Sequence, residues 1–320
     1  MKHLIFLIFI ILVSSVSADI LTDYRQNGLR AIEKELDLKL TDKNYWKEYL
    51  KAQDTSFGYI EKYENILICD KSKHTLSLYV KENGKYKLKK TYSAYTGKKK
   101  GDKVREGDLR TPIGIYNLTK KISKLDSFYG PLAFVTSYPN FYDKIKGKDG
   151  SGIWIHGVPA DKKRNKYTKG CIALENKNIK FLDKIINIDK TLLIISPNKL
   201  QKKPSDAKLT VILTSLYKWR YAWIYNDINN YIKYYSTTFK KNNGTTYKRY
   251  KKYKTRVFKK NEQKSIIFKN LTVIPYPNSQ NIFQITFDED YKSDSLKFNG
   301  EKKLLITLDK SNSFKIFLEK

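Results

Sequence analysis

Apolar residues follow two different periods along the chain. Near the N-terminus they recur every three or four residues, in two groups that residues 41–42 separate. This spacing puts them on one face of a helix, so a small helical segment is predicted over residues 19–57. The first group contains Leu29, Ile32, Leu36 and Leu40, and the second contains Tyr45, Trp46, Tyr49 and Leu50.

From Tyr59 onward short β-rich runs replace the helical spacing, and an Asn-Gly pair at residues 83–84 predicts a hairpin turn between two of them. A short helix capped by Asn176 and a buried strand over Thr191–Ser196 follow. The pattern predicts a mainly β domain over residues 58–197. Its first predicted strands are Asn65–Cys69, Thr75–Val80, Lys87–Ala94, Gly114–Leu118 and Leu132–Ser137.

A second domain is predicted over residues 205–320, after a linker of prolines and lysines at residues 198–204. Residues 205–239 have an amphipathic helical pattern, and strand-like runs come after it, which is typical of an α+β domain. Four large aromatic residues of the helical part, Trp219, Trp223, Tyr231 and Tyr235, are expected to form its core. The predicted strands are Thr255–Phe258, Ser265–Asn270, Phe283–Phe287 and Lys303–Leu308.

The first 18 residues have the order of a secretory signal. Lys2 precedes an apolar run over residues 4–13, and small residues follow as far as Ala18, after which cleavage is predicted. The apolar run is too short for a permanent membrane span. We therefore expect an exported protein, with an uncleaved membrane tether as the alternative.

The formal net charge is +31, and so strong a positive field favours an anionic partner. Export and the lack of a recognisable nucleic-acid motif favour an anionic wall polymer or a membrane surface over nucleic acid. An AT-rich coding sequence would enrich the chain in lysine equally well. Residues 247–254 alternate aromatic and basic side chains, which fits either stacking on sugar rings or a strand with one solvated face.

One histidine and one cysteine lie in the same Gly-rich stretch. His156 ends an apolar strand-like run, and Cys171 follows 15 residues later (171 − 156 = 15), directly after Gly170. A cysteine nucleophile needs a base, a group that orients the base, and donors for an oxyanion. His156 is the candidate base with a backbone carbonyl to orient it, and the N–H groups of Gly170 and Cys171 are candidate donors. Cys69 is expected to be a buried free thiol, with a Cys69–Cys171 disulfide as the alternative.

Two blocks of the chain resemble the L,D-transpeptidase catalytic family of the YkuD type. One is His-Gly followed by Thr-x-Gly-Cys-Ile at residues 156–172, and the other is Gly-Asp-Leu-Arg-Thr-Pro-Ile-Gly-Ile-Tyr at residues 107–116. The resemblance covers residues 59–197 and implies a β-sandwich-like catalytic domain that acts on peptidoglycan stem peptides. The signal, the helical lead-in and a C-terminal cone of the nuclear-transport-factor-2-like (NTF2-like) type are similar to cell-shape-determining L,D-carboxypeptidases of helical bacteria.

The resemblance implies that Cys171 attacks the bond after the L-centre of a diamino acid. His156 is then the general base and acid, and the carbonyl of Gly157 orients its ring. The residues expected to line the oxyanion and substrate site are Gly170, Thr168, Lys169 and Arg110.

This chain departs from the family pattern at two places. Transpeptidases of the family commonly have a histidine or a similar residue before the Gly-Cys pair and an arginine two residues after the cysteine, where this chain has Lys169 and Ala173. The expected activity is therefore removal of the terminal D-Ala from stem tetrapeptides, that is, an L,D-carboxypeptidase. The alternative is a cross-linking L,D-transpeptidase, and a third reading is an inactive exported wall-binding protein.

The expected location is the periplasm. No cofactor or metal is implied, because no histidine or carboxylate cluster with ligand spacing accompanies the cysteine. Nothing in the sequence sets the oligomeric state.

Overall fold

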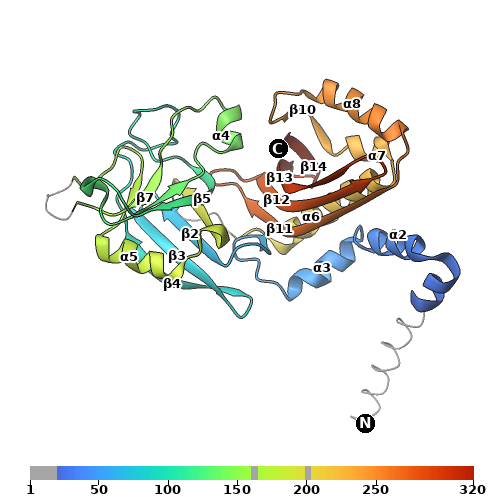
Figure 1. Cartoon of the computed structure of the whole chain (residues 1–320), viewed down its shortest axis with the longest axis horizontal. Coiled ribbons are helices and arrows are strands. Elements are labelled where there is room, and N and C mark those ends of the chain that lie inside the picture. Colours follow the sequence, from blue (N-terminus) through green and yellow to red (C-terminus); the bar gives the residue numbers. More distant parts are fainter. Residues whose placement is uncertain (1–19, 160–164, 199–202) are drawn as a thin grey trace, which may run out of the picture.

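The computed structural model describes residues 20–159, 165–198 and 203–320. Two β-rich bodies lie side by side, and the N-terminal helices lie along the C-terminal one (Figure 1). The predicted signal at residues 1–18 lies outside the described residues. None of the helices in the described part of the chain combines the length and the apolar character needed to cross a membrane.

The N-terminal segment forms helices α2 (Leu29–Lys39) and α3 (Lys43–Lys51), as the apolar spacing predicted. Asp42 caps α3 by accepting a backbone hydrogen bond in its first turn. On α3, Trp46 is buried, and its ring centroid lies 4.9 Å from that of Tyr217 in the C-terminal body. The segment therefore packs on the C-terminal body through its aromatic face.

The first body is built on one eight-stranded sheet with the order β4-β3-β2-β9-β5-β6-β7-β8. All five strands predicted between residues 65 and 137 are present. The sheet encloses an apolar core that includes Leu67, Phe134 and Ile155, which matches the expected sandwich-like architecture. The strands are β2 (Asn65–Asp70), β3 (Thr75–Glu82), β4 (Lys85–Ser93), β5 (Gly114–Ile122), β6 (Ala133–Thr136), β7 (Trp154–His156), β8 (Ile172–Ala173) and β9 (Thr191–Ser196). The helices are η1 (Ser127–Tyr129), α4 (Phe141–Ile145), α5 (Asn176–Ile185) and η2 (Ile188–Lys190).

The second body curves a six-stranded sheet, with the order β1-β11-β12-β13-β14-β10, around a long helix (Figure 1). The prediction that the four large aromatic residues form its core is confirmed, since all four are buried in one cluster. The helices are α6 (Asp206–Ile224), α7 (Ile228–Ile232) and α8 (Tyr247–Lys259). The strands are β1 (Tyr59–Ile60), β10 (Tyr235–Lys241), β11 (Lys264–Pro275), β12 (Ile282–Ser293), β13 (Lys297–Leu308) and β14 (Phe314–Glu319).

Two predictions for this body were wrong. Residues 255–258 belong to helix α8 and not to a strand, and the helical pattern expected up to residue 239 ends at α7. Tyr250, Lys254 and Phe258 are four residues apart, so α8 turns them toward the cone, and Tyr250 and Phe258 are buried. A run of four residues is too short to separate a period of 2 from one of 3.6, and its β-branched and aromatic residues misled the assignment.

The two bodies share a strand and a core. Strand β1 belongs to the segment that leads into the first sheet, but it pairs antiparallel with β11, with Tyr59 opposite Val273. Ile60, Ile274 and Leu305 then lie in one apolar cluster with residues of both bodies. This contact fixes how the second body sits against the first.

Candidate active site

Strands β7 and β8 bring the histidine and the cysteine to one edge of the sheet. The two strands are parallel, with Ile155 opposite Ile172, so His156 at the end of β7 lies beside the segment that Cys171 begins. The N–H of Leu174 donates to the carbonyl of His156 at 2.9 Å and closes this pairing. Residues that are distant in sequence thus become neighbours because the chain between them returns to the same edge.

The imidazole of His156 is oriented by the residue that follows it. Its Nδ1 lies 2.6 Å from the carbonyl oxygen of Gly157. A carbonyl only accepts, so we assign the proton to Nδ1, which leaves Nε2 as the basic nitrogen. The side chain is 1% exposed, and the ring of Tyr129 packs edge-on against it with centroids 5.1 Å apart.

Cys171 lies in a compact turn of residues 168–171, called the cysteine turn below. The hydroxyl of Thr168 donates to the carbonyl of Cys171 at 2.7 Å and accepts from the N–H of Gly170 at 2.9 Å. The Cys171 Sγ lies 3.4 Å from the carbonyl oxygen of Gly152. The N–H of Gly170 is therefore engaged by Thr168, and the expectation that it faces an oxyanion is not met in this arrangement.

Asn176 has a different role from the one that the sequence suggested. Helix α5 is capped by Glu175 without a side-chain hydrogen bond, so the expected Asn176 cap was wrong. Its amide instead makes two hydrogen bonds to the backbone of Val158, at 2.9 Å and 2.8 Å. A Cβ on Gly157 would lie 2.4 Å from its Oδ1, so only glycine fits between them. Asn176 thus fixes the loop after the histidine, and no local pattern pointed to this.

A second loop, residues 97–111, lies behind the cysteine turn. A Cβ on Gly170 would lie 2.8 Å from the carbonyl oxygen of Arg110, so the two segments are in close contact. Within the described residues, Arg110 Nε is buried and has no hydrogen-bond partner. Lys169 is exposed beside the turn. Arg164, the other basic residue near the motif, lies outside the described residues.

The second cysteine is far from this chemistry. Cys69 is fully buried in β2, and burial raises its thiol pKa to about 12. Cys69 and Cys171 form no disulfide, so the disulfide alternative is wrong.

A separate cluster of buried charges lies inside the cone of the C-terminal body. Lys302 Nζ is 3.2 Å from carboxylate oxygens of both Glu289 and Glu319. Lys254 Nζ lies 4.4 Å from the ring centroid of Trp223. Burial, followed by repulsion from Lys302, lowers the pKa of Lys254 to about 7. These residues belong to the C-terminal body, whereas Cys171 belongs to the first body.

In the described residues, no group of three or more His, Cys, Asp or Glu side chains is placed to hold a metal ion.

Comparison with known proteins places both bodies in families. Residues 64–195 match the YkuD L,D-transpeptidase catalytic domain, and residues 211–320 match the Cds6 C-terminal NTF2-like domain. The helical cell shape determining protein Pgp2 from Campylobacter jejuni is 33% identical, and its crystal structure superimposes with a TM-score of 0.80 over 88% of this chain and 100% of that one. The chain belongs to the YkuD L,D-transpeptidase family.

Two other relatives differ in how much of this architecture they share. The structure of Bdellovibrio bacteriovorus Bd1075 is 27% identical in sequence, with a TM-score of 0.67 over 83% of this chain and 96% of that one. An Escherichia coli (strain K12) protein named "Putative L,D-transpeptidase YafK" is 35% identical over 111 residues. That match covers 34% of this chain and 42% of the curated relative.

Proposed function

We propose that this protein is a cysteine-dependent L,D-carboxypeptidase that removes the terminal D-Ala from peptidoglycan stem tetrapeptides. The observation that carries the proposal is the pairing of β7 with β8, which brings the segment that Cys171 begins alongside His156, whose Nδ1 lies 2.6 Å from the Gly157 carbonyl oxygen. Membership in the YkuD family supports the reaction class. The similarity to a cell shape determining protein supports the peptidoglycan substrate.

In the proposed mechanism, His156 Nε2 takes the thiol proton of Cys171, and the thiolate attacks the carbonyl before the terminal D-Ala. The tetrahedral intermediate collapses when His156 gives the proton to the D-Ala nitrogen. This step breaks the amide bond and leaves a thioester on Cys171. Water then attacks the thioester, His156 takes a proton from it, and the products are a tripeptide with a free carboxylate and the restored thiol.

The neutral histidine tautomer suits both steps, because Nε2 must accept a proton before it can give one. Thr168 supports the turn through its two hydrogen bonds. The backbone N–H of Cys171 is the oxyanion donor that we propose, because the N–H of Gly170 already donates to Thr168.

Arg110 and Lys169 are the proposed contacts for substrate carboxylates. A stem tetrapeptide ends in a carboxylate, and a buried guanidinium N–H with no partner is suited to bind one. Lys169 adds a positive charge at the exposed side of the turn.

Trimming is favoured over cross-linking by the residue two positions after the cysteine. Ala173 is fully buried, and its backbone N–H and carbonyl both hydrogen-bond to Tyr95, at 2.9 Å and 2.8 Å. This position therefore offers no side chain to a second stem peptide, and water is the proposed acceptor. Cross-linking, in which an amine attacks the thioester, stays the alternative.

We also propose that the protein acts in the periplasm beside an anionic polymer or membrane surface. The chain has no Asp or Glu between Asp227 and Glu262, and helix α8 carries six exposed cationic residues on its outer side. Like charges at this spacing destabilise a helix, so an anionic surface would stabilise it. Sedimentation with purified cell walls or with anionic vesicles, at low and high salt, would separate the two partners, and no binding to either would contradict this part of the proposal. The six residues are Lys248, Arg249, Lys251, Lys252, Arg256 and Lys259.

The test of the enzymatic proposal is mass spectrometry of purified tetrapeptide muropeptide after incubation with the protein from residue 19 onward. Loss of one D-Ala supports the carboxypeptidase, and cross-linked dimers would assign the transpeptidase instead. Cys171→Ala is the matched control and is expected to lose activity by at least about 10³-fold, because the nucleophile is gone. Unchanged substrate with both proteins would favour the inactive wall-binding reading.

A further inference from the structure

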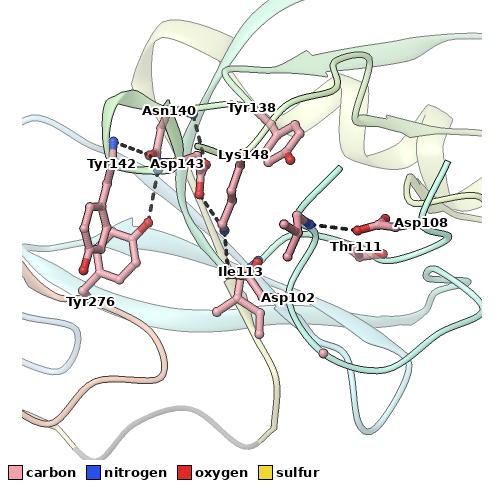
Figure 2. A network of polar contacts seen from close by, with 12 residues as sticks. Asp102, Asp108, Thr111, Ile113, Tyr138, Asn140, Tyr142, Asp143, Lys148 and Tyr276 are labelled. Carbon is pink, nitrogen blue, oxygen red and sulfur yellow. Dashed lines mark hydrogen bonds and ion pairs between the residues drawn. The ribbon is translucent and has the colours of Figure 1, made fainter. Parts of the chain in front are cut away.

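A buried lysine outside the catalytic pair links two loops that flank the cysteine. Lys148 Nζ lies 2.5 Å from Asp102 Oδ2 and 2.8 Å from Asp143 Oδ1, and its side chain is 5% exposed (Figure 2). Asp102 belongs to the loop of residues 97–111. Lys148 itself begins the short segment that leads to Gly152 and strand β7.

Both of these loops touch the cysteine turn. The carbonyl of Gly152 accepts from Cys171 Sγ at 3.4 Å. On the other side, the carbonyl of Arg110 lies against Gly170, where an added Cβ would be 2.8 Å from it. The position of the turn is thus set from two sides, and Lys148 joins these two sides through Asp102.

The loop that holds Asp102 is itself fixed at several points. Asp102 Oδ1 accepts from the N–H of Ile113 at 2.8 Å, just before strand β5 (Figure 2). Lys71 Nζ donates to the carbonyls of Gly101, at 2.5 Å, and Thr111. These contacts leave little freedom in the loop, so a change at Asp102 is transmitted to the backbone near residue 110.

The same cluster reaches the C-terminal body. Asp143 is in helix α4, where Asn140 and Asp143 form a capping box. The Nδ2 of Asn140 donates to the hydroxyl of Tyr276 at 3.3 Å, and Tyr276 follows strand β11 (Figure 2). The ring of Tyr276 also packs edge-on against Tyr142, with centroids 5.1 Å apart. The chain of contacts therefore runs from the second body to the cysteine turn.

A role in stability alone does not account for this arrangement. Burial disfavours the ammonium of Lys148, and the hydrogen-bonded carboxylates of Asp102 and Asp143 offset this and raise its pKa above the usual value. Buried ion pairs of this kind are often no more stabilising than apolar residues of the same size. What they do supply is a defined geometry, because each charge accepts only a few arrangements of its partners.

We propose that Lys148 is a positioning residue for the cysteine turn. Tyr276, through Asn140 and Asp143, connects the C-terminal body to Lys148. Lys148 does not touch the substrate. It holds the loops on the two sides of Cys171 at the spacing that points the thiol toward the end of β7. This inference rests on the proposed function where it is tested by D-Ala release, but its test by the alkylation rate of Cys171 does not depend on that function.

The experiment compares Lys148→Met, Lys148→Arg, Asp102→Asn and Tyr276→Phe in the full chain from residue 19, all in a Cys69→Ala background. Cys171 is then the one thiol, and its alkylation rate by iodoacetamide is followed across about pH 5 to 9. kcat and KM for D-Ala release and thermal unfolding are measured on the same samples. Lys121→Met is the matched control, because Lys121 forms an ion pair with Asp183 at 2.7 Å elsewhere in the same body.

We expect Lys148→Met to lower kcat and the alkylation rate at neutral pH by about tenfold or more with a smaller change in KM, since sub-ångström misplacement of a catalytic group has effects of this size. Lys148→Arg should recover part of the loss, because it keeps the charge. Asp102→Asn and Tyr276→Phe should show the same pattern to a smaller extent, and they decide the question if Lys148→Met does not fold.

The proposal is overturned if the folded variants match Lys121→Met in both kcat and alkylation rate. It is also overturned if only their melting temperatures change, because this would mean a purely structural role. If the parent protein alkylates normally but releases no D-Ala, the proposed function fails, and the alkylation series still tests the positioning role.

Discussion

Gly170→Ala is the sharpest test of how the cysteine turn is built. Gly170 has a φ of +143°, in a region that is open almost only to glycine, and an added Cβ would lie 2.8 Å from the carbonyl oxygen of Arg110. The backbone strain costs about 1–3 kcal/mol and the overpacking about 1–3 kcal/mol, so the free energy of unfolding should fall by about 2–6 kcal/mol.

The effect on catalysis follows from the same geometry. An ordinary contact begins at 3.4 Å, so the turn must move by 3.4 − 2.8 = 0.6 Å. Because a displacement of 1 Å can cost about 10²-fold in rate, we expect kcat for D-Ala release to fall by about tenfold or more. Denaturant unfolding and steady-state kinetics measure the two effects separately.

Gly147→Ala is the matched control. Gly147 also has a positive φ, of +70°, but an added Cβ would meet nothing within 4 Å. This variant has the backbone strain without the close contact, so its free energy of unfolding should fall by only about 1–2 kcal/mol and its activity should be unchanged. If Gly170→Ala were no less stable than Gly147→Ala and turned over within twofold of the wild type, the close contact with Arg110 would not shape the site.

Two further predictions concern pH. Because the folded-state pKa of Lys254, about 7, lies below its usual 10.5, the unfolded chain binds the extra proton between these values, and stability should rise from about pH 7 to pH 10. Lys254→Met should remove this rise and increase the free energy of unfolding at pH 7 by about 1–3 kcal/mol, whereas Lys252→Met, at an exposed position, should do neither. If denaturant unfolding gave the same pH profile for Lys254→Met as for the wild type, this prediction would be contradicted. Burial of Asp108 opposes its ionisation, but hydrogen bonds from backbone N–H groups and Lys103 outweigh it and lower its pKa from 3.8 to about 2. The ionised Asp108 therefore stabilises the fold above about pH 4, and this stabilisation is lost as the pH falls toward 2. Asp108→Asn should lower the free energy of unfolding by about 1 kcal/mol above pH 4 and reduce its dependence on acid pH. If this variant unfolded in acid as the wild type does, the lowered pKa of Asp108 would not explain the acid sensitivity.

The strands between residues 65 and 137 were predicted correctly because the signal for each strand lies within its own few residues. Alternation and buried β-branched residues are properties of a few consecutive residues, and the hairpin at residues 83–84 depends on an Asn-Gly pair. The four aromatic residues of the second body were likewise assigned to the core, because their spacing turns them to one side of the chain. Where the run was too short, as at residues 255–258, the local signal was ambiguous and the assignment failed.

The sequence by itself determined the fold class and pointed to the candidate pair His156 and Cys171, because residue type and order within a motif are visible in a short stretch of chain. Only the tertiary structure decided how these residues are held. The side-chain amide of Asn176 makes hydrogen bonds to the backbone of Val158, 18 residues earlier, and Lys148 makes a hydrogen-bonded ion pair with Asp102, 46 residues earlier. Such contacts depend on how strands pair and loops return, and no periodicity in the chain encodes them. The candidate catalytic pair and the Gly157 carbonyl beside His156 could therefore be predicted from the motif, whereas the contacts of Asn176 and Lys148 could not.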